Sequence, residues 1–184
     1  MARTTPRVLV FNGGSSSGKS TLTRALQERL PGAWLRLGVD TLVEACPPSL
    51  LGSQGLHLAE DGSVGVAEAF TAVERFWMAG VARMAELGAL ILVEDNFVTG
   101  PAAQRRWRQA LQDIPTGWVA VRCDAAVAAR RERHRADRIT GMAEQQADAV
   151  HVGVDYDLEV DAGRKSPAEL ADEVHARWFG SSCA

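Results

Sequence analysis

Apolar residues in this chain gather in short, nearly continuous runs, separated by segments in which apolar positions recur every three or four residues. Continuous apolar runs are typical of parallel strands that are buried on both faces. In the last run apolar and acidic residues alternate, which predicts a strand with one buried face. The predicted strands cover residues 7–12, 33–37, 89–93, 118–123 and 154–160.

The segments between these runs predict helices. The longest is expected at 67–87, with one apolar stripe made of Phe70, Val73, Trp77, Val81, Met84 and Leu87. The last helix should begin at a capping box of Ser166 and Glu169. The other helices are expected at 22–30, 41–45, 101–112, 130–138 (capped by Asp124) and 142–150. Strands that alternate with helices predict an α/β fold with three layers, a five-stranded parallel sheet and helices on both of its faces.

Residues 41–66 interrupt this alternation. From Ser49 to Val66 there is little periodicity, and two short apolar segments flank Glu60-Asp61-Gly62, which predicts a hairpin. Insertions in α/β enzymes commonly shape the pocket for a second substrate, so we expect this segment to do so. With 184 residues, the chain is expected to form one domain, 1–184.

The segment between the first predicted strand and the first predicted helix matches G-x-x-x-x-G-K-[ST], a loop that binds nucleoside triphosphates. Gly13 and Gly18 allow backbone angles that turn successive amides toward an anion. A Gly- and Ser-rich linker could match by chance, but the flanking strand and helix favour a phosphate-binding loop. We expect ATP to be held by Gly13, Gly14, Ser15, Ser16, Ser17, Gly18, Lys19, Ser20 and Thr21, with Lys19 on the outer phosphates and Ser20 on Mg²⁺.

Composition limits the kinds of molecule and compartment with which this protein is expected to be associated. A net charge of −3 gives no support to nucleic-acid binding. No apolar run is long enough to cross a membrane, and no signal peptide is recognisable. The three cysteines are widely spaced and form no CxxC pair, which fits a reducing cytoplasm. We therefore expect a cytoplasmic protein that binds neither nucleic acid nor membrane.

Three acids follow predicted strands, where ligands of open α/β sheets bind. Asp40 follows the second strand beside the insertion, so we assign it the general base that accepts a hydroxyl proton. The alternative is that Asp40 only caps the next helix. Glu94 and Asp95 follow a buried strand and are alternatives for supporting Mg²⁺; our choice is Asp95, and the competing interpretation is a solvated strand end.

Arginines cluster in two places. Those at 130–138 precede a glycine, and mobile guanidinium groups on a lid at about 130–142 could stabilise a transferring phosphoryl group. The alternative is a solvated basic helix in which Glu132 and Asp137 pair with neighbouring arginines. We interpret the cluster at 105–108 as surface, with Trp107 in the core, and assign no role to the four histidines.

Several segments together resemble chloramphenicol phosphotransferase. The resemblance runs from about Val8 to Asp161, in the same order. Its most specific parts follow the phosphate loop. The segments are 12–16 (NGGSS), 38–42 (GVDTL), 121–124 (VRCD), 135–138 (RADR), 141–143 (GMA) and 150–157 (VHVGVDYD).

The resemblance implies an ATP-dependent kinase of the nucleotide-kinase-like fold that phosphorylates the primary hydroxyl of chloramphenicol. It implies that Asp40 is the general base, that Arg135 and Arg138 are lid arginines, and that Arg131 stacks on adenine. Two segments depart from the family. Residues 94–96 (EDN) stand where an Asp-Asp pair and an apolar residue are expected, and 46–51 (CPPSLL) replace a Met-bearing segment near the acceptor.

The leading hypothesis is therefore an ATP- and Mg²⁺-dependent O-phosphotransferase that acts on a small-molecule hydroxyl, most simply that of chloramphenicol. Two alternatives remain: a kinase for another small-molecule alcohol, and an ATP-binding regulatory or toxin-like protein. The oligomeric state and the physiological role stay open at this stage.

Overall fold

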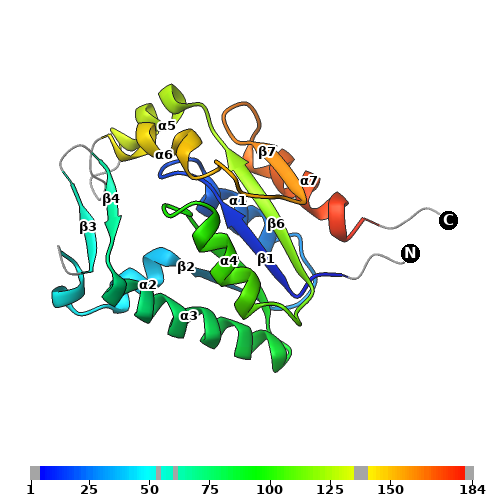
Figure 1. Ribbon diagram of the computed structural model, residues 1–184. Coiled ribbons are helices and arrows are strands. Elements are labelled where there is room, and N and C mark those ends of the chain that lie inside the picture. The colour runs from blue at the N-terminus through cyan, green and yellow to red at the C-terminus, as the bar shows by residue number, and fades with distance from the viewer. Residues whose placement is uncertain (1–4, 53–54, 60–61, 135–140, 181–184) are drawn as a thin grey trace.

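The computed structural model describes residues 5–52, 55–59, 62–134 and 141–180. Its central feature is a five-stranded sheet in the order β2–β5–β1–β6–β7, with every neighbouring pair parallel. Figure 1 shows β1 in the middle of the molecule. The strands are β1 (Val8–Asn12), β2 (Trp34–Gly38), β5 (Leu90–Asp95), β6 (Thr116–Arg122) and β7 (Leu158–Asp161). The predicted fold class is confirmed.

Seven helices are described, in addition to one short 3₁₀ turn at Pro48–Leu50. They are α1 (Lys19–Gln27), α2 (Val39–Ala45), α3 (Glu68–Glu86), α4 (Pro101–Ala110), α5 (Ala125–Glu132), α6 (Met142–Ala149) and α7 (Pro167–Trp178). No helix in the described part of the chain is long and apolar enough to span a bilayer.

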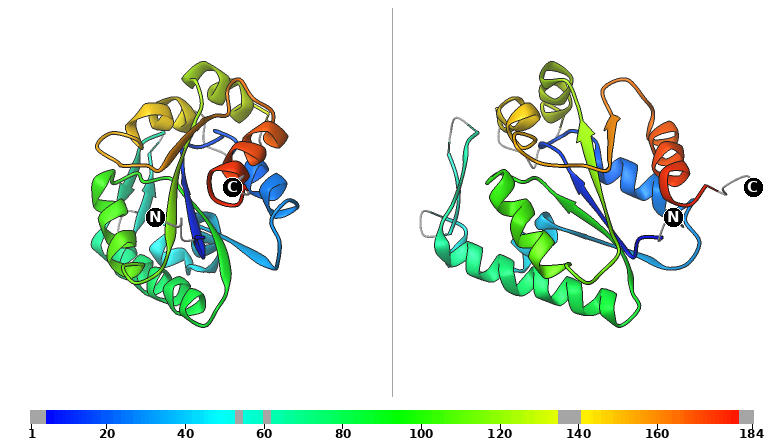
Figure 2. Two further views of the ribbon diagram at one scale, coloured as in Figure 1. Left: turned by 90° about the vertical axis from the view of Figure 1, so that its right-hand side faces the viewer. Right: turned by 45° about the vertical axis from the view of Figure 1, so that its right-hand side comes forward.

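Strand β1 divides the core into two halves. All five of its residues are buried, and alternate side chains point to opposite faces of the sheet. Val8 and Val10 pack with α3 and α4, whereas Leu9 and Phe11 pack with α1 and α7. Figure 2 shows these two helix pairs on opposite sides of the sheet.

The predicted hairpin is present as β3 (Leu56–Leu58) and β4 (Val64–Val66), which pair antiparallel away from the main sheet (Figure 1). Gly62, which precedes β4, lies against the start of α6. Gly62 has φ +84, and a Cβ atom at this position would come within 2.5 Å of the Met142 amide nitrogen. The close approach and the positive φ both require glycine here.

Some predicted boundaries are wrong. The predicted stripe on α3 is confirmed at Phe70 and Val81, which are buried, and at Trp77 and Met84, which pack partly buried against the core, but Leu87 is 72% exposed. The predicted strand at 154–160 begins only at Leu158. Helix α5 starts directly after its predicted cap, Asp124, whose carboxylate accepts hydrogen bonds from the Ala126 and Val127 amides, but it ends at Glu132 rather than 138.

Asn12, the last residue of β1, ties the sheet to the loops on either side. Its side-chain oxygen accepts a hydrogen bond from the Phe97 amide at 2.9 Å. Its side-chain nitrogen donates to the Val150 carbonyl at 2.8 Å and to the Tyr156 hydroxyl at 2.5 Å. The Tyr156 hydroxyl also lies 2.8 Å from Nδ1 of buried His151. This network fixes the chain just before the phosphate loop.

The buried ring of His151 predicts a pH dependence of stability. Burial, aided by the positive charge of Arg122, lowers the pKa of His151 to about 4. The unfolded chain, with an ordinary pKa of about 6.5, binds more protons between these values, so this contribution to stability is complete above about pH 6.5 and is lost toward pH 4. The difference in free energy of unfolding between wild type and His151→Asn should therefore fall by about 3 kcal/mol from pH 7 to pH 4. Urea unfolding across this range measures it, and a difference that does not change with pH would contradict the expectation.

Candidate functional site

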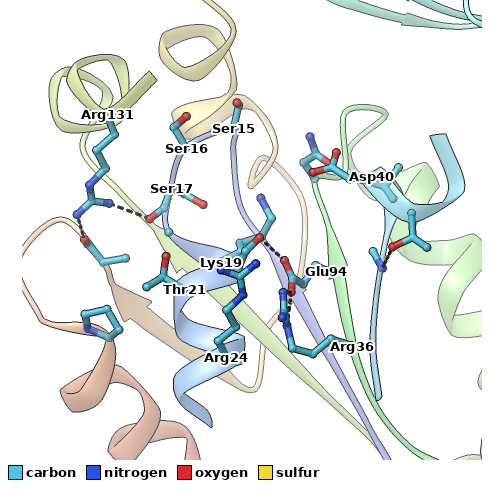
Figure 3. A pocket seen from close by; sticks show the side chains of 18 of the residues that line it. Ser15, Ser16, Ser17, Lys19, Thr21, Arg24, Arg36, Asp40, Glu94 and Arg131 are labelled. Carbon is cyan, nitrogen blue, oxygen red and sulfur yellow. Dashed lines mark hydrogen bonds and ion pairs between the residues drawn. The ribbon is translucent and has the colours of Figure 1, made fainter. Parts of the chain in front are cut away.

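A cleft of about 1020 Å³ opens at the carboxyl ends of the parallel strands. We call it the phosphate-loop cleft. It is lined by the loop after β1, the start of α2, the end of β5 and the segment that leads into α7. Figure 3 shows Arg131 and Asp40 on opposite sides of this cleft, with Lys19 between them.

The loop that carries the predicted phosphate-binding residues has the expected conformation. Ser16 and Gly18 have φ angles of 56 and 105, which open the turn between strand and helix. The hydroxyl oxygens of Ser15, Ser16 and Ser17 are buried, and they have no hydrogen-bond partner among the described residues. Buried polar groups are normally paired, so these hydroxyls suit the oxygens of a bound phosphate. The loop therefore fits an anionic ligand.

Lys19 begins α1 and bends back over the loop. Its Nζ donates to the carbonyl oxygens of Gly13 and Gly14, at 2.6 and 3.0 Å. The positive end of α1 faces the same cleft. The loop thus gathers a cation, a helix N-terminus and unpaired hydroxyls in one place, as phosphate binding requires.

Glu94, near the end of β5, contacts the Ser20 hydroxyl. Its Oε2 accepts from Ser20 at 2.5 Å, and its Oε1 accepts from the Thr23 hydroxyl at 2.6 Å. Arg36 from β2 forms an ion pair with Glu94, with Nη2 and Oε1 2.9 Å apart. Burial opposes ionisation of this carboxyl, but the hydrogen bonds from Ser20, Thr23 and Arg36 outweigh burial, and the pKa of Glu94 lies below its usual value. Glu94 is therefore an anion beside the predicted Mg²⁺ residue.

Asp95, our choice for the metal, lies on the other face of β5. Its carboxylate is buried and accepts hydrogen bonds from the Trp107 indole at 2.6 Å and from the Asn96 amide at 2.7 Å. Burial, opposed by the Trp107 hydrogen bond, raises its pKa to about 6. The structure does not bring Asp95 to Ser20; it brings Glu94 there.

Asp40 is exposed at the first turn of α2 and lines the phosphate-loop cleft. The N-cap of this helix is Gly38, whose amide lies 3.4 Å from the Thr41 hydroxyl. The alternative in which Asp40 acts as the helix cap is therefore wrong. Helix α2 positions the Asp40 carboxylate, and this carboxylate does not cap the helix.

Arg131 closes the cleft on the side opposite Asp40. It donates to the carbonyl oxygens of Ser17 at 3.1 Å and Ala162 at 2.8 Å. Arg135 and Arg138 lie outside the described residues. Among the described residues Glu132 forms no ion pair with an arginine, in contrast to one alternative above; its two oxygens accept hydrogen bonds from the Gly141 and Ala143 amides, both at 2.8 Å. The two ends of the predicted lid are thus held together.

A second cavity of about 110 Å³ lies beside the cleft, between the β3–β4 hairpin, α2, α3 and α6. We call it the hairpin cavity. Most of its wall is apolar, but it also contains an ion pair between Glu74 on α3 and Arg106 on α4, 2.6 Å apart. Four residues line both spaces: Val39, Asp40, Val43 and Asn96.

The family model for chloramphenicol phosphotransferase-like proteins matches residues 6–179. The chain belongs to this family. Two proteins of Mycobacterium tuberculosis, from strains CDC 1551 and H37Rv and both named as O-phosphotransferases, are each 30% identical to the chain, over 92% of its length and 80% of theirs. Family and fold make the chain a phosphotransferase.

Solved structures share the fold at low sequence identity. The tunicamycin resistance protein of Deinococcus radiodurans superimposes with a TM-score of 0.68 at 16% identity, covering 97% of this chain and 98% of that one. The APS kinase CysC of M. tuberculosis, solved with AMPPNP and APS, gives a TM-score of 0.61 at 19% identity, covering 94% and 97%. The chain therefore has the fold of kinases that bind nucleotides.

Two residues at the site of this phosphotransferase could not be found from the sequence. Arg36 reads as a polar position within a strand, and its pairing with Glu94 depends on the adjacency of β2 and β5. Arg106 was interpreted as surface because it stands in a basic cluster, yet it pairs with a glutamate on another helix. No local signal in the sequence indicates either contact.

The phosphate loop also makes a testable packing prediction. A Cβ atom on Gly13 would lie 2.5 Å from the Val121 carbonyl oxygen, which is backbone and cannot turn aside. Gly13→Ala should lower the free energy of unfolding by about 1–3 kcal/mol and weaken ATP binding. Gly80→Ala is the matched control, because nothing lies within 4 Å of a Cβ there and alanine in a helix should stabilise by about 1 kcal/mol. Thermal unfolding compares the two; equal effects would contradict the packing argument.

Proposed function

We propose that this phosphotransferase uses ATP to phosphorylate a hydroxyl of a small molecule, with chloramphenicol or a related antibiotic as the acceptor. One observation carries the proposal: Asp40 lines both the phosphate-loop cleft and the hairpin cavity. A carboxylate at this junction can reach an alcohol in the cavity and the end of a triphosphate in the cleft.

In the proposed reaction the acceptor hydroxyl gives its proton to the Asp40 carboxylate. The hydroxyl oxygen forms a bond to the γ-phosphorus of ATP, and the bond between that phosphorus and the bridging oxygen to the β-phosphate breaks, leaving ADP. Lys19 stabilises the negative charge on the phosphates. We assign the same role to Arg135 and Arg138 on the strength of the family resemblance.

The nucleotide is assigned to the phosphate-loop cleft, with its phosphates on residues 13–21 and its base near Arg131. The contacts of Arg131 with Ser17 and Ala162 place its guanidinium at the end of the cleft away from Asp40. The buried, unpaired loop hydroxyls support the phosphate assignment. Because the three cysteines are widely spaced and form no CxxC pair, which fits a reducing compartment, we assign the enzyme to the cytoplasm.

The residues around Ser20 fit Mg²⁺. Within the described residues no group of three metal-ligating side chains exists, and Mg²⁺ usually keeps several waters and uses only one or two carboxylates together with phosphate oxygens. We now assign Glu94 in place of Asp95, with the Ser20 hydroxyl, to this ion. When bound, Mg²⁺ neutralises charge on the phosphates.

A smaller alcohol is the second candidate acceptor. The hairpin cavity, at about 110 Å³, is smaller than the roughly 300–1,000 Å³ that is usual for drug-sized ligands. Chloramphenicol would therefore need the hairpin to move outward, whereas a smaller polyol or sugar would not. The departure at 46–51 from the family pattern lies close to the same hairpin in sequence.

The proposal predicts ADP release from ATP and Mg²⁺ that depends on chloramphenicol. Asp40→Asn should lower kcat by about 10²–10⁴-fold while the Kd for ATP stays within about twofold, because the loop is unchanged. Lys19→Ala, the negative control, should abolish release. Release that another alcohol stimulates instead would identify the second candidate. Release that no alcohol stimulates would contradict the proposal and favour a nucleotide-binding regulator.

The metal assignment predicts that substitutions of the two neighbouring acids have different effects on the Mg²⁺ concentration needed for activity. Glu94→Gln should raise the Mg²⁺ concentration for half-maximal activity by about 10- to 100-fold, because it removes the anion beside Ser20. Asp95→Asn, which changes a buried carboxylate bonded to Trp107 and Asn96, should leave that concentration unchanged. Titrating Mg²⁺ in the ADP-release assay distinguishes them, and the reverse pattern would restore Asp95 as the metal residue.

A further inference from the structure

Gln146, on α6, separates the two spaces of the site. Only 6% of this residue is exposed, and it lines the hairpin cavity rather than the phosphate-loop cleft. Its backbone lies against the phosphate loop, since a Cβ atom on Gly14 would come within 3.1 Å of Gln146. Gln146 therefore contacts the loop on one side and the cavity on the other.

The two ends of the Gln146 carboxamide have different surroundings. Its Oε1 accepts a hydrogen bond from the Ser15 amide at 2.9 Å, and the Asn96 side-chain nitrogen lies 3.4 Å from the same atom. Its Nε2 is buried and has no partner among the described residues. A buried amide nitrogen without an acceptor is unfavourable and rare in folded proteins.

Gln104 provides a comparison within the same molecule. This glutamine is similarly buried, with 4% exposed, and both ends of its side chain are bonded. Its Nε2 donates to the Asp155 carbonyl at 2.6 Å, and its Oε1 accepts from the Asp155 amide at 3.1 Å. Both ends of the Gln104 side chain are thus paired, whereas Gln146, which lines the hairpin cavity, keeps a donor without a partner among the described residues.

We propose that Gln146 is a specificity-determining residue whose side-chain N–H donates to an oxygen atom of the acceptor molecule. The inference rests on the proposed function, because it takes the hairpin cavity to hold the acceptor. The fixed Ser15 contact on Oε1 sets the direction of the N–H bonds, so acceptor and phosphate loop are aligned through one side chain. The chemistry required of the acceptor is a carbonyl, nitro or hydroxyl oxygen that can accept a hydrogen bond.

The test is isothermal titration of chloramphenicol into protein saturated with a non-hydrolysable ATP analogue, followed by KM and kcat in the ADP-release assay. Gln146→Met fills a similar space without the N–H donor; it also removes the oxygen that accepts from the Ser15 amide, and the comparison between analogues below separates the two losses. This variant should raise the Kd and KM for chloramphenicol by about tenfold or more, and it should change kcat less than KM. The same titrations use chloramphenicol analogues that lack the amide carbonyl, the nitro group or the secondary hydroxyl. For the analogue that lacks the bonded oxygen, wild type and Gln146→Met should bind equally.

Two glutamine-to-methionine variants serve as matched controls. Gln145→Met changes the exposed neighbour on α6, and it should leave acceptor binding unchanged. Gln104→Met breaks the structural hydrogen bonds with Asp155. It should lower the unfolding temperature without changing the relative affinities for the analogues. The inference would be overturned if Gln146→Met left the Kd for chloramphenicol unchanged, or if it lowered the affinity for every analogue equally. An enzyme that releases no ADP with any alcohol contradicts the proposed function instead.

Discussion

The site depends on one side chain at the end of the central strand. Asn12 bonds to Phe97 on one side and to Val150 and Tyr156 on the other. Phe97 lies in the wall of the hairpin cavity, and Val150 ends α6, which carries Gln146. A single buried carboxamide thus fixes the segments around the phosphate loop. Pairing matters in such a buried network, because a buried donor or acceptor without a partner destabilises the fold.

Side chains along β5 alternate between the two faces of the sheet, so the adjacent acids Glu94 and Asp95 contact different parts of the molecule. Leu92 belongs to the core beneath α1, while Ile91 and Val93 belong to the core beneath α3 and α4. With a period of two, Glu94 follows Leu92 toward α1 and Ser20, and Asp95 follows Val93 toward Trp107 on α4. The pleat, rather than any difference between the two carboxyl groups, decides which acid reaches the phosphate loop.

The hairpin, α6 and α2 together form much of the wall of the hairpin cavity. Gly62 rests on the first residues of α6, and α6 rests on the phosphate loop at Gly14. The wall of the hairpin cavity is therefore continuous with the nucleotide-binding loop. In this arrangement the buried Glu74–Arg106 pair is part of the wall, and such pairs are costly unless their geometry and hydrogen bonding are good. The bonds from Arg106 Nε and Nη2 to the same Glu74 oxygen meet this requirement.

Local sequence patterns were sufficient to predict much of the secondary structure of the molecule. The succession of strands and helices along the chain, the phosphate loop, the hairpin and the capping residues Asp124 and Ser166 are all properties of short segments, because turn chemistry and periodicity act over a few residues. Family resemblance added chloramphenicol as the expected acceptor and the expected contact of Arg131 with adenine. What only the tertiary structure decided are contacts between distant segments: Glu94 with Arg36, Glu74 with Arg106, and Gln146 with Ser15. These pairs depend on strand order, on the face to which a side chain points and on how closely two backbones approach, and none of these is encoded within a single segment.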